Sequence, residues 1–135
     1  MVGLIIIGHG RLAEAMKDAV EHVLGRQAQL AAINVMADDD PAVIQQRLAE
    51  EVAACDCGDG VIICADMFGG TPCNIALGCM EPGRIEILSG VSLPSLIAIA
   101  SERAALRDVG KIARKGAASG RRYLCLASKL LQKEV

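Results

Sequence analysis

One short stretch near the start of the chain most constrains the fold: the apolar run Leu4–Ile7, which leads directly into Gly8-His9-Gly10. A run of this kind, rich in isoleucine and ended by glycine, predicts a strand over residues 2–7 that is buried on both faces of a sheet. In α/β proteins, ligands bind just beyond the carboxyl ends of such strands. We therefore interpret His9, one of only two histidines, as the main functional residue.

The composition predicts an aliphatic core. The 135 residues fit a single domain, 1–135. The chain is 53% hydrophobic but holds no Trp, one Phe and one Tyr. Few rings are available to stack on bases or on a flavin, so we expect neither nucleic-acid binding nor an aromatic-sandwiched cofactor. No cofactor is expected at all.

The lack of a visible targeting signal and the pattern of cysteine usage predict a cytoplasmic protein. The apolar runs fall short of the roughly 20 residues that a membrane span needs, and no basic segment or cleavage site precedes the first strand. Six cysteines without a secretion signal are expected to be free thiols. Residues 101–135 carry nine Lys/Arg and three Asp/Glu, which we interpret as solvated helix surface.

Strand-like and helix-like segments alternate along the chain and predict an α/β sandwich with a largely parallel sheet. Asp40 and Thr71, each followed by proline, are expected to be helix N-caps. Gly120 is expected to end the last helix, and Arg121–Ala127 to form a final antiparallel edge strand. The expected strands cover residues 2–7, 30–35, 61–65 and 84–88, and the expected helices cover 11–24, 41–54, 71–79, 91–104 and 109–118.

The topology of such a sheet brings two distant residues together. Right-handed crossovers that place helices on both faces make the first and third strands neighbours, with a crevice beyond their carboxyl ends. His9 follows the first strand and Asp66 follows the third. A carboxylate beside an imidazole fixes its tautomer and leaves the other ring nitrogen as a nucleophile. We therefore expect His9 and Asp66 to act as a pair.

Small and polar residues around this pair favour an anionic group. Gly10, Gly69 and Gly70 allow backbone N–H groups to approach an anion, and Thr71 offers a hydroxyl. Together these features indicate phosphoryl transfer through phosphohistidine. Two other interpretations stay open from the residues alone. The Asp–His bond could be purely structural, with glycines that only make turns, or the chain could be an aspartyl-phosphate receiver, although the acidic pair expected after its first strand is missing.

Metal binding is poorly supported. His9, Asp66 and a distant cysteine follow no known ligand spacing. Asp38-Asp39-Asp40 is better explained as a helix start, and Cys55-Asp56-Cys57 has no second cysteine pair. The other histidine, His22, is expected on the surface. We expect no metal site.

Three stretches in order, GLIIIGHGRLAEAM, DMFGGTPCNIA and GVSLPSL, resemble the enzyme IIA domain of the mannose family of the bacterial sugar phosphotransferase system. The resemblance extends over essentially the whole chain. It implies four parallel strands in the order 2-1-3-4 and an antiparallel edge strand, often exchanged within a homodimer. It further implies that His9 is phosphorylated, Asp66 holds its other ring nitrogen, Thr71 contacts the phosphate, and Phe68, Gly69 and Gly70 form the aromatic-Gly-Gly loop.

The resemblance also implies partners. In this family the histidine takes phosphate from the phosphocarrier protein HPr and passes it to a IIB domain, which phosphorylates sugar during uptake. No IIB domain or linker follows Val135, so a IIB partner is expected to be a separate chain. Some similar stand-alone members act as regulators. The alternative function is therefore a module that signals its phosphorylation state to a kinase or a transcription factor.

Overall fold

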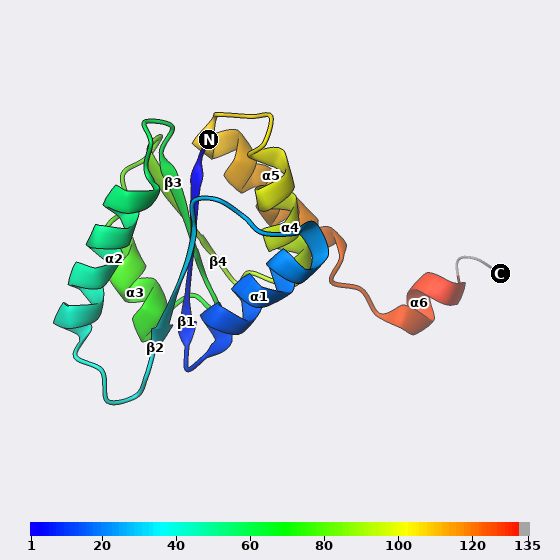
Figure 1. Cartoon of the computed structure of the whole chain (residues 1–135). Coiled ribbons are helices and arrows are strands. Elements are labelled where there is room, and N and C mark those ends of the chain that lie inside the picture. The colour runs from blue at the N-terminus through cyan, green and yellow to red at the C-terminus, as the bar shows by residue number, and fades with distance from the viewer. Residues whose placement is uncertain (133–135) are drawn as a thin grey trace.

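The computed structural model describes residues 1–132, which fold as three layers with a parallel sheet in the middle (Figure 1). The sheet order is β2-β1-β3-β4, and every neighbouring pair is parallel. The strands are β1 (Gly3–His9), β2 (Leu30–Val35), β3 (Val61–Ala65) and β4 (Ile85–Ser89). The predicted strand order is therefore confirmed.

Helices cover both faces of the sheet (Figure 1). They are α1 (Leu12–Leu24), α2 (Pro41–Cys55), α3 (Thr71–Leu77), α4 (Leu93–Glu102), α5 (Val109–Arg122) and α6 (Ala127–Gln132). The helices α1, α4 and α5 lie on one face, and α2 and α3 lie on the other. Among the described residues, no helix is both long and apolar enough to cross a bilayer.

Strand β1 supplies both halves of the core, because successive side chains point to opposite faces. Ile5 and Ile7 pack toward α2 and α3, while Leu4 and Ile6 pack toward α1, α4 and α5. All four side chains are almost completely buried. Burial on both faces explains why this strand is apolar at every position rather than at alternate ones.

Two helix starts differ in how well the sequence predicted them. Asp40 caps α2 as expected, and its Oδ1 accepts the Ala42 N–H at 3.0 Å. The expectation for Thr71 was wrong: Gly70 is the N-cap of α3 and Thr71 is the first helical residue. The Thr71 side chain is therefore not a cap, and its hydroxyl stays available at the end of the sheet.

The prediction of a final strand over Arg121–Ala127, all of which the structure describes, is wrong. Helix α5 runs through Gly120 and ends at Arg122, and α6 begins at Ala127. Every residue from 121 to 132 is exposed, and the segment extends away from the sheet (Figure 1). Two arginines in the last turn of α5 suit the negative end of its helix dipole. An alternating sequence forms a strand only where it pairs with a sheet edge, and among residues 1–132 this segment pairs with none of the four strands, although Arg121 and Leu124 lie beside β4.

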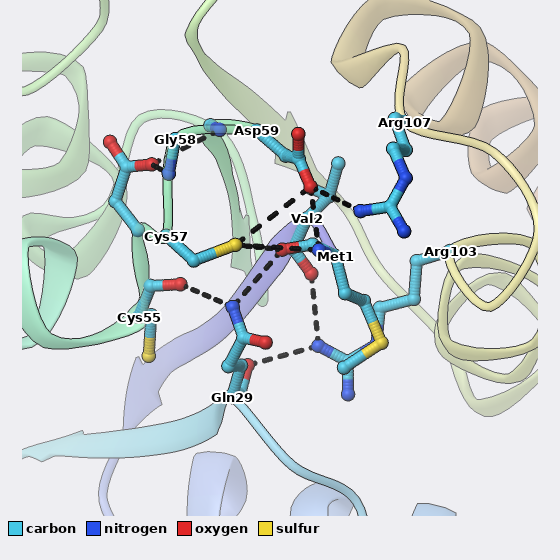
Figure 2. A network of polar contacts seen from close by, with 11 residues as sticks. Met1, Val2, Gln29, Cys55, Cys57, Gly58, Asp59, Arg103 and Arg107 are labelled. Atoms are coloured by element: carbon cyan, nitrogen blue, oxygen red, sulfur yellow. Dashed lines mark hydrogen bonds and ion pairs between the residues drawn. The ribbon is translucent and has the colours of Figure 1, made fainter.

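At the amino end of the sheet, a buried arginine links the residues that precede β1 to those that precede β2 (Figure 2). Arg103 is 1% exposed and donates to the carbonyls of Val2, Ala28 and Gln29 at 3.1, 2.6 and 3.0 Å. Burial lowers the pKa of Arg103. The Gln29 carbonyl also accepts the Leu4 N–H at 2.9 Å, so the guanidinium adds a second donor there and is the donor to the Val2 and Ala28 carbonyls that precede β1 and β2. This network lies at the end of the sheet opposite His9.

Candidate phosphoryl-transfer site

The site forms where β1 and β3 end side by side. Ile7 pairs with Ala65 in the ladder, so the residues that follow, at the ends of these strands, lie next to each other. His9 is the last residue of β1, and Asp66 directly follows β3. The prediction that these two residues meet is confirmed by geometry.

Two hydrogen bonds join His9 to the same carboxylate oxygen. Asp66 Oδ2 accepts the His9 backbone N–H at 2.9 Å and lies 2.7 Å from His9 Nδ1. The second carboxylate oxygen, Oδ1, accepts the Met67 N–H at 2.9 Å. An ionised carboxylate accepts hydrogen bonds and cannot donate one, so the proton of a neutral imidazole belongs on Nδ1. Within residues 1–132, no hydrogen-bond partner reaches Nε2.

The electrostatics favour an ionised Asp66. Partial burial acts to raise the pKa of this carboxyl, and the backbone and side-chain hydrogen bonds from His9 act to lower it. The hydrogen bonds prevail, and the pKa of Asp66 lies below its ordinary value. The Asp66 side chain is 10% exposed, whereas that of His9 is 50% exposed. A shielded carboxylate therefore supports a ring that other molecules can reach.

The glycine loop packs directly against the imidazole. A Cβ on Gly70 would lie 2.7 Å from His9 Cε1 and 3.1 Å from His9 Nε2. Only glycine allows the backbone to come this close to the ring. Gly69 precedes it with a φ of +85°, a conformation that side chains disfavour. The two glycines thus bring main-chain groups to the side of His9 that carries the unpaired nitrogen.

The expected phosphate-binding residues are divided between the groove and its rim. His9, Gly10 and Thr71 line one groove of about 390 Å³. Phe68 is 70% exposed and does not line this groove. Its side chain therefore lies at the surface and does not close the groove.

Part of the groove comes from residues that sequence reasoning missed. The segment after β2 contributes Val35, Met36 and Asp39 to the lining. Asp39 Oδ2 accepts the Met36 N–H at 2.8 Å, which holds this turn in place. The signal was present in the strand order, because the carboxyl end of β2 must lie at the same edge of the sheet as His9. The run Asp38-Asp39-Asp40 by itself predicts only a helix start.

The described residues contain no group of three or more His, Cys, Asp or Glu side chains arranged to hold a metal ion. All six cysteines are free, including Cys55 and Cys57. The groups that the site itself brings together are an imidazole oriented by a carboxylate, the main chain of Gly70 and the hydroxyl of Thr71.

Comparison with known proteins gives concordant results. Residues 3–115 match the EIIA-man family model, described as "PTS system fructose IIA component". The chain is 30% identical over 112 residues to the PTS system fructose-specific EIIA component of Bacillus subtilis (strain 168), covering 81% of this chain and 77% of that protein. It is 26% identical over 97 residues to the mannose-specific EIIAB component of Escherichia coli (strain K12), covering 71% of this chain and only 30% of that longer protein.

The fold is also similar to a solved structure. The crystal structure of phosphotransferase system component EIIA from Streptococcus agalactiae superimposes with a TM-score of 0.87. The match covers 96% of this chain and 99% of that one, at 23% sequence identity. At this level of identity, the likeness concerns the fold.

Proposed function

The chain belongs to the EIIA-man family of the sugar phosphotransferase system, and we propose that it carries a phosphoryl group on Nε2 of His9. The donor is phospho-HPr, and the acceptor is a IIB component. Membership makes the protein a phosphotransfer component of this system. The donor, the acceptor and the carrier atom are the parts that we propose.

One observation carries the proposal: His9 Nδ1 lies 2.7 Å from Asp66 Oδ2, while Nε2 has no partner among residues 1–132. Nε2 attacks the phosphorus of the donor phosphohistidine. A nitrogen–phosphorus bond forms at Nε2, and the corresponding bond in the donor breaks. The proton on Nδ1 stays in place, and ionised Asp66 stabilises the positive charge that develops on the ring.

The negative charge on the phosphoryl oxygens needs donors. Backbone N–H groups of Gly69 and Gly70 and the hydroxyl of Thr71 are the groups that we propose for this role, whereas the Gly10 N–H, which we expected to contribute, already donates to the Val35 carbonyl at 2.8 Å. Support comes from the groove that Thr71 shares with His9, and from the close approach of Gly70 to the ring. In the next step the IIB nucleophile attacks the same phosphorus, and Nε2 leaves with its electron pair.

The direct test is to incubate the protein with labelled phospho-HPr. We expect an acid-labile label on the wild-type protein and no label on His9→Ala. The matched control is His22→Ala, because His22 is an exposed histidine on α1, away from β3. Phosphorus NMR of the labelled protein then separates phosphate on Nε2 from phosphate on Nδ1. A label that survives His9→Ala, or an acid-stable label, would contradict the proposal.

We also propose that the protein is a homodimer. The segment 123–132 projects from the molecule and exposes Leu124 (86%), Leu126 (66%) and Leu131 (64%). Beside the edge strand β4 lies a groove of about 280 Å³, lined in part by Leu88, Val91 and Leu124. An exposed apolar segment next to an apolar groove at a free sheet edge favours pairing between two copies.

A further inference from the structure

The turn that carries His9 into α1 is held by β2. The Gly10 N–H donates to the Val35 carbonyl at 2.8 Å, and Gly10 itself has a φ of +60°. In the ladder, Gly8 pairs with Asn34 and His9 pairs with Val35. The end of β2 therefore lies alongside the turn, on the side opposite the one from which Asp66 holds His9.

Helix α1 is not capped by the side chain of the residue at its N-cap position, Arg11. Arg11 makes no side-chain hydrogen bond to the first turn. Asn34 of β2 does so instead: its Oδ1 accepts the Glu14 backbone N–H at 3.2 Å. The Glu14 carboxylate in return accepts a hydrogen bond from Asn34 Nδ2 at 3.0 Å. This reciprocal pair resembles a capping box in which one member comes from a neighbouring strand.

The His9 side chain has few other restraints. It is 50% exposed, so packing alone does not fix the ring, and its position also depends on the hydrogen bond to Asp66 and on the backbone that carries it. Asp66 acts directly from β3. On the other side, the Asn34–Glu14 pair and the Gly10–Val35 hydrogen bond fix the residues that immediately follow His9. A loss of about 1 Å in such positioning can cost about a hundredfold in rate.

We propose that Asn34 and Glu14 are positioning residues for phosphoryl uptake at His9, an inference that rests on the proposed function. They act through the start of α1 and touch neither the imidazole nor the phosphoryl group. Asn34 is suited to the task because an amide both accepts from a backbone N–H and donates to a carboxylate. An aspartate at position 34 would instead set a second carboxylate against Glu14.

The test exchanges the chemistry of the two positions. Asn34→Asp removes the donor and opposes two carboxylates, and we expect the rate of uptake from phospho-HPr at saturation to fall about tenfold. Adding Glu14→Gln restores a reciprocal pair, because the new amide can donate to the new carboxylate. The double variant has the wild-type net charge, and we expect it to recover most of the rate. Gln46 is an exposed residue of α2, and Gln46→Glu is the control for one added negative charge.

The expected pattern is a loss in the saturated rate of Asn34→Asp with little change in the concentration of HPr at half saturation. Thermal unfolding of each variant checks that the fold persists. The nitrogen NMR signals of the His9 ring provide a second readout that does not need phosphate. We expect them to shift in Asn34→Asp and to return in the double variant.

Three results would overturn the inference. These are a wild-type rate for Asn34→Asp, a loss that the double variant does not restore, and unchanged His9 ring signals. A wild-type protein that takes up no label would contradict the proposed function itself. In that case the ring signals still decide whether Asn34 and Glu14 position His9.

Discussion

At the residue scale, the central feature is a single carboxylate oxygen that accepts two hydrogen bonds from one histidine. Asp66 Oδ2 holds both the backbone N–H and the Nδ1 side of His9, so the main chain and the ring share one anchor. The arrangement sets the tautomer and the orientation of the imidazole together. Changes at Asp66 should therefore affect the chemistry of His9 more than the stability of the fold.

We expect Asp66→Asn to slow phosphoryl uptake by about a hundredfold or more without unfolding the chain. An amide placed to donate to Nδ1 would favour the tautomer with its proton on Nε2, which removes the nucleophilic electron pair. The measurement is the rate of label transfer from phospho-HPr, with circular dichroism to check the fold. Equal rates for the variant and the wild type would show that Asp66 is not the orienting group.

The same carboxyl predicts a pH dependence of stability. The folded pKa of Asp66 lies below its ordinary value, so its ionised form stabilises the folded chain above about pH 4. That contribution is lost as the pH falls through the folded pKa. We expect the free energy of unfolding to decrease more steeply on acidification in the wild type than in Asp66→Asn. Denaturant titrations between about pH 6 and pH 2 measure this difference.

The control for this pH experiment is Asp18→Asn, an exposed carboxylate of α1. It is the reference for the loss of one exposed carboxyl group. If Asp66→Asn showed the same acid limb as the wild type, the lowered pKa of Asp66 would be contradicted.

At the element scale, one side chain at the end of α4 holds the amino ends of two strands. Arg103 donates to the carbonyls of Val2 and Gln29, as Figure 2 shows, and to that of Ala28. Losing the guanidinium would leave the Val2 and Ala28 carbonyls without this donor, whereas the Gln29 carbonyl would keep the Leu4 N–H. The strand ends therefore depend on a residue more than 70 positions away from either of them in sequence.

We expect Arg103→Met to lower the free energy of unfolding by about 3 kcal/mol, because buried carbonyls become unsatisfied. Arg103→Lys should lose less, because an ammonium can still donate to some of them. The control is Arg107→Ala, which removes an exposed ion pair with Asp59 and should cost less than about 1 kcal/mol. Urea unfolding compares the variants. Similar losses at positions 103 and 107 would contradict the role of the buried guanidinium.

Helix packing gives a second prediction at this scale. Gly116 lies where α5 meets α4, and a Cβ there would be 2.6 Å from Ile99 Cγ1. We expect Gly116→Ala to destabilise the chain by about 1–3 kcal/mol through overpacking. A Cβ at Gly110, in the same helix, would lie 3.2 Å from the flexible end of Arg114 and 3.4 Å from Asp108 Oδ1, so Gly110→Ala should be neutral or slightly stabilising. Thermal unfolding of both variants tests this contrast, which equal effects would contradict.

At the scale of the whole molecule, the two ends of the sheet have different tasks. The carboxyl end holds His9, Asp66 and the groove, whereas the amino end holds the Arg103 network. The C-terminal segment lies apart from both and exposes apolar side chains (Figure 1). Assembly through this segment would leave the groove beside His9 open to a partner protein.

We expect the wild-type protein to have twice the 14.1 kDa mass of the chain in solution. Replacing Leu124 and Leu126 by Asp should yield a monomer, because charge is then placed on the exposed apolar segment. The control is Val43→Asp on α2, which is also exposed but lies on another face and should stay dimeric. Sedimentation velocity measures the mass. A monomeric wild type would contradict the proposed dimer.

Much of this architecture was predictable because it rests on local and directional rules. Short apolar runs identified all four strands, and the handedness of crossovers made β1 and β3 neighbours and brought His9 to Asp66, whereas the full order 2-1-3-4 was implied by the family resemblance. Asp40 capped its helix because a side-chain acceptor and a following proline act within a few residues. These features depend on neighbours in the chain or on a topology with few alternatives.

Only the tertiary structure decided the features that depend on distant surfaces. The segment 121–127 alternates like a strand, but α5 continues through its first two residues and, among the described residues, the segment does not pair with the neighbouring edge strand β4. The contribution of Asp39 to the groove, and the capping of α1 by Asn34, arise from contacts between separate elements. Hydrophobic periodicity reports which face of an element is buried, whereas the partner of each polar group depends on where the elements come to lie.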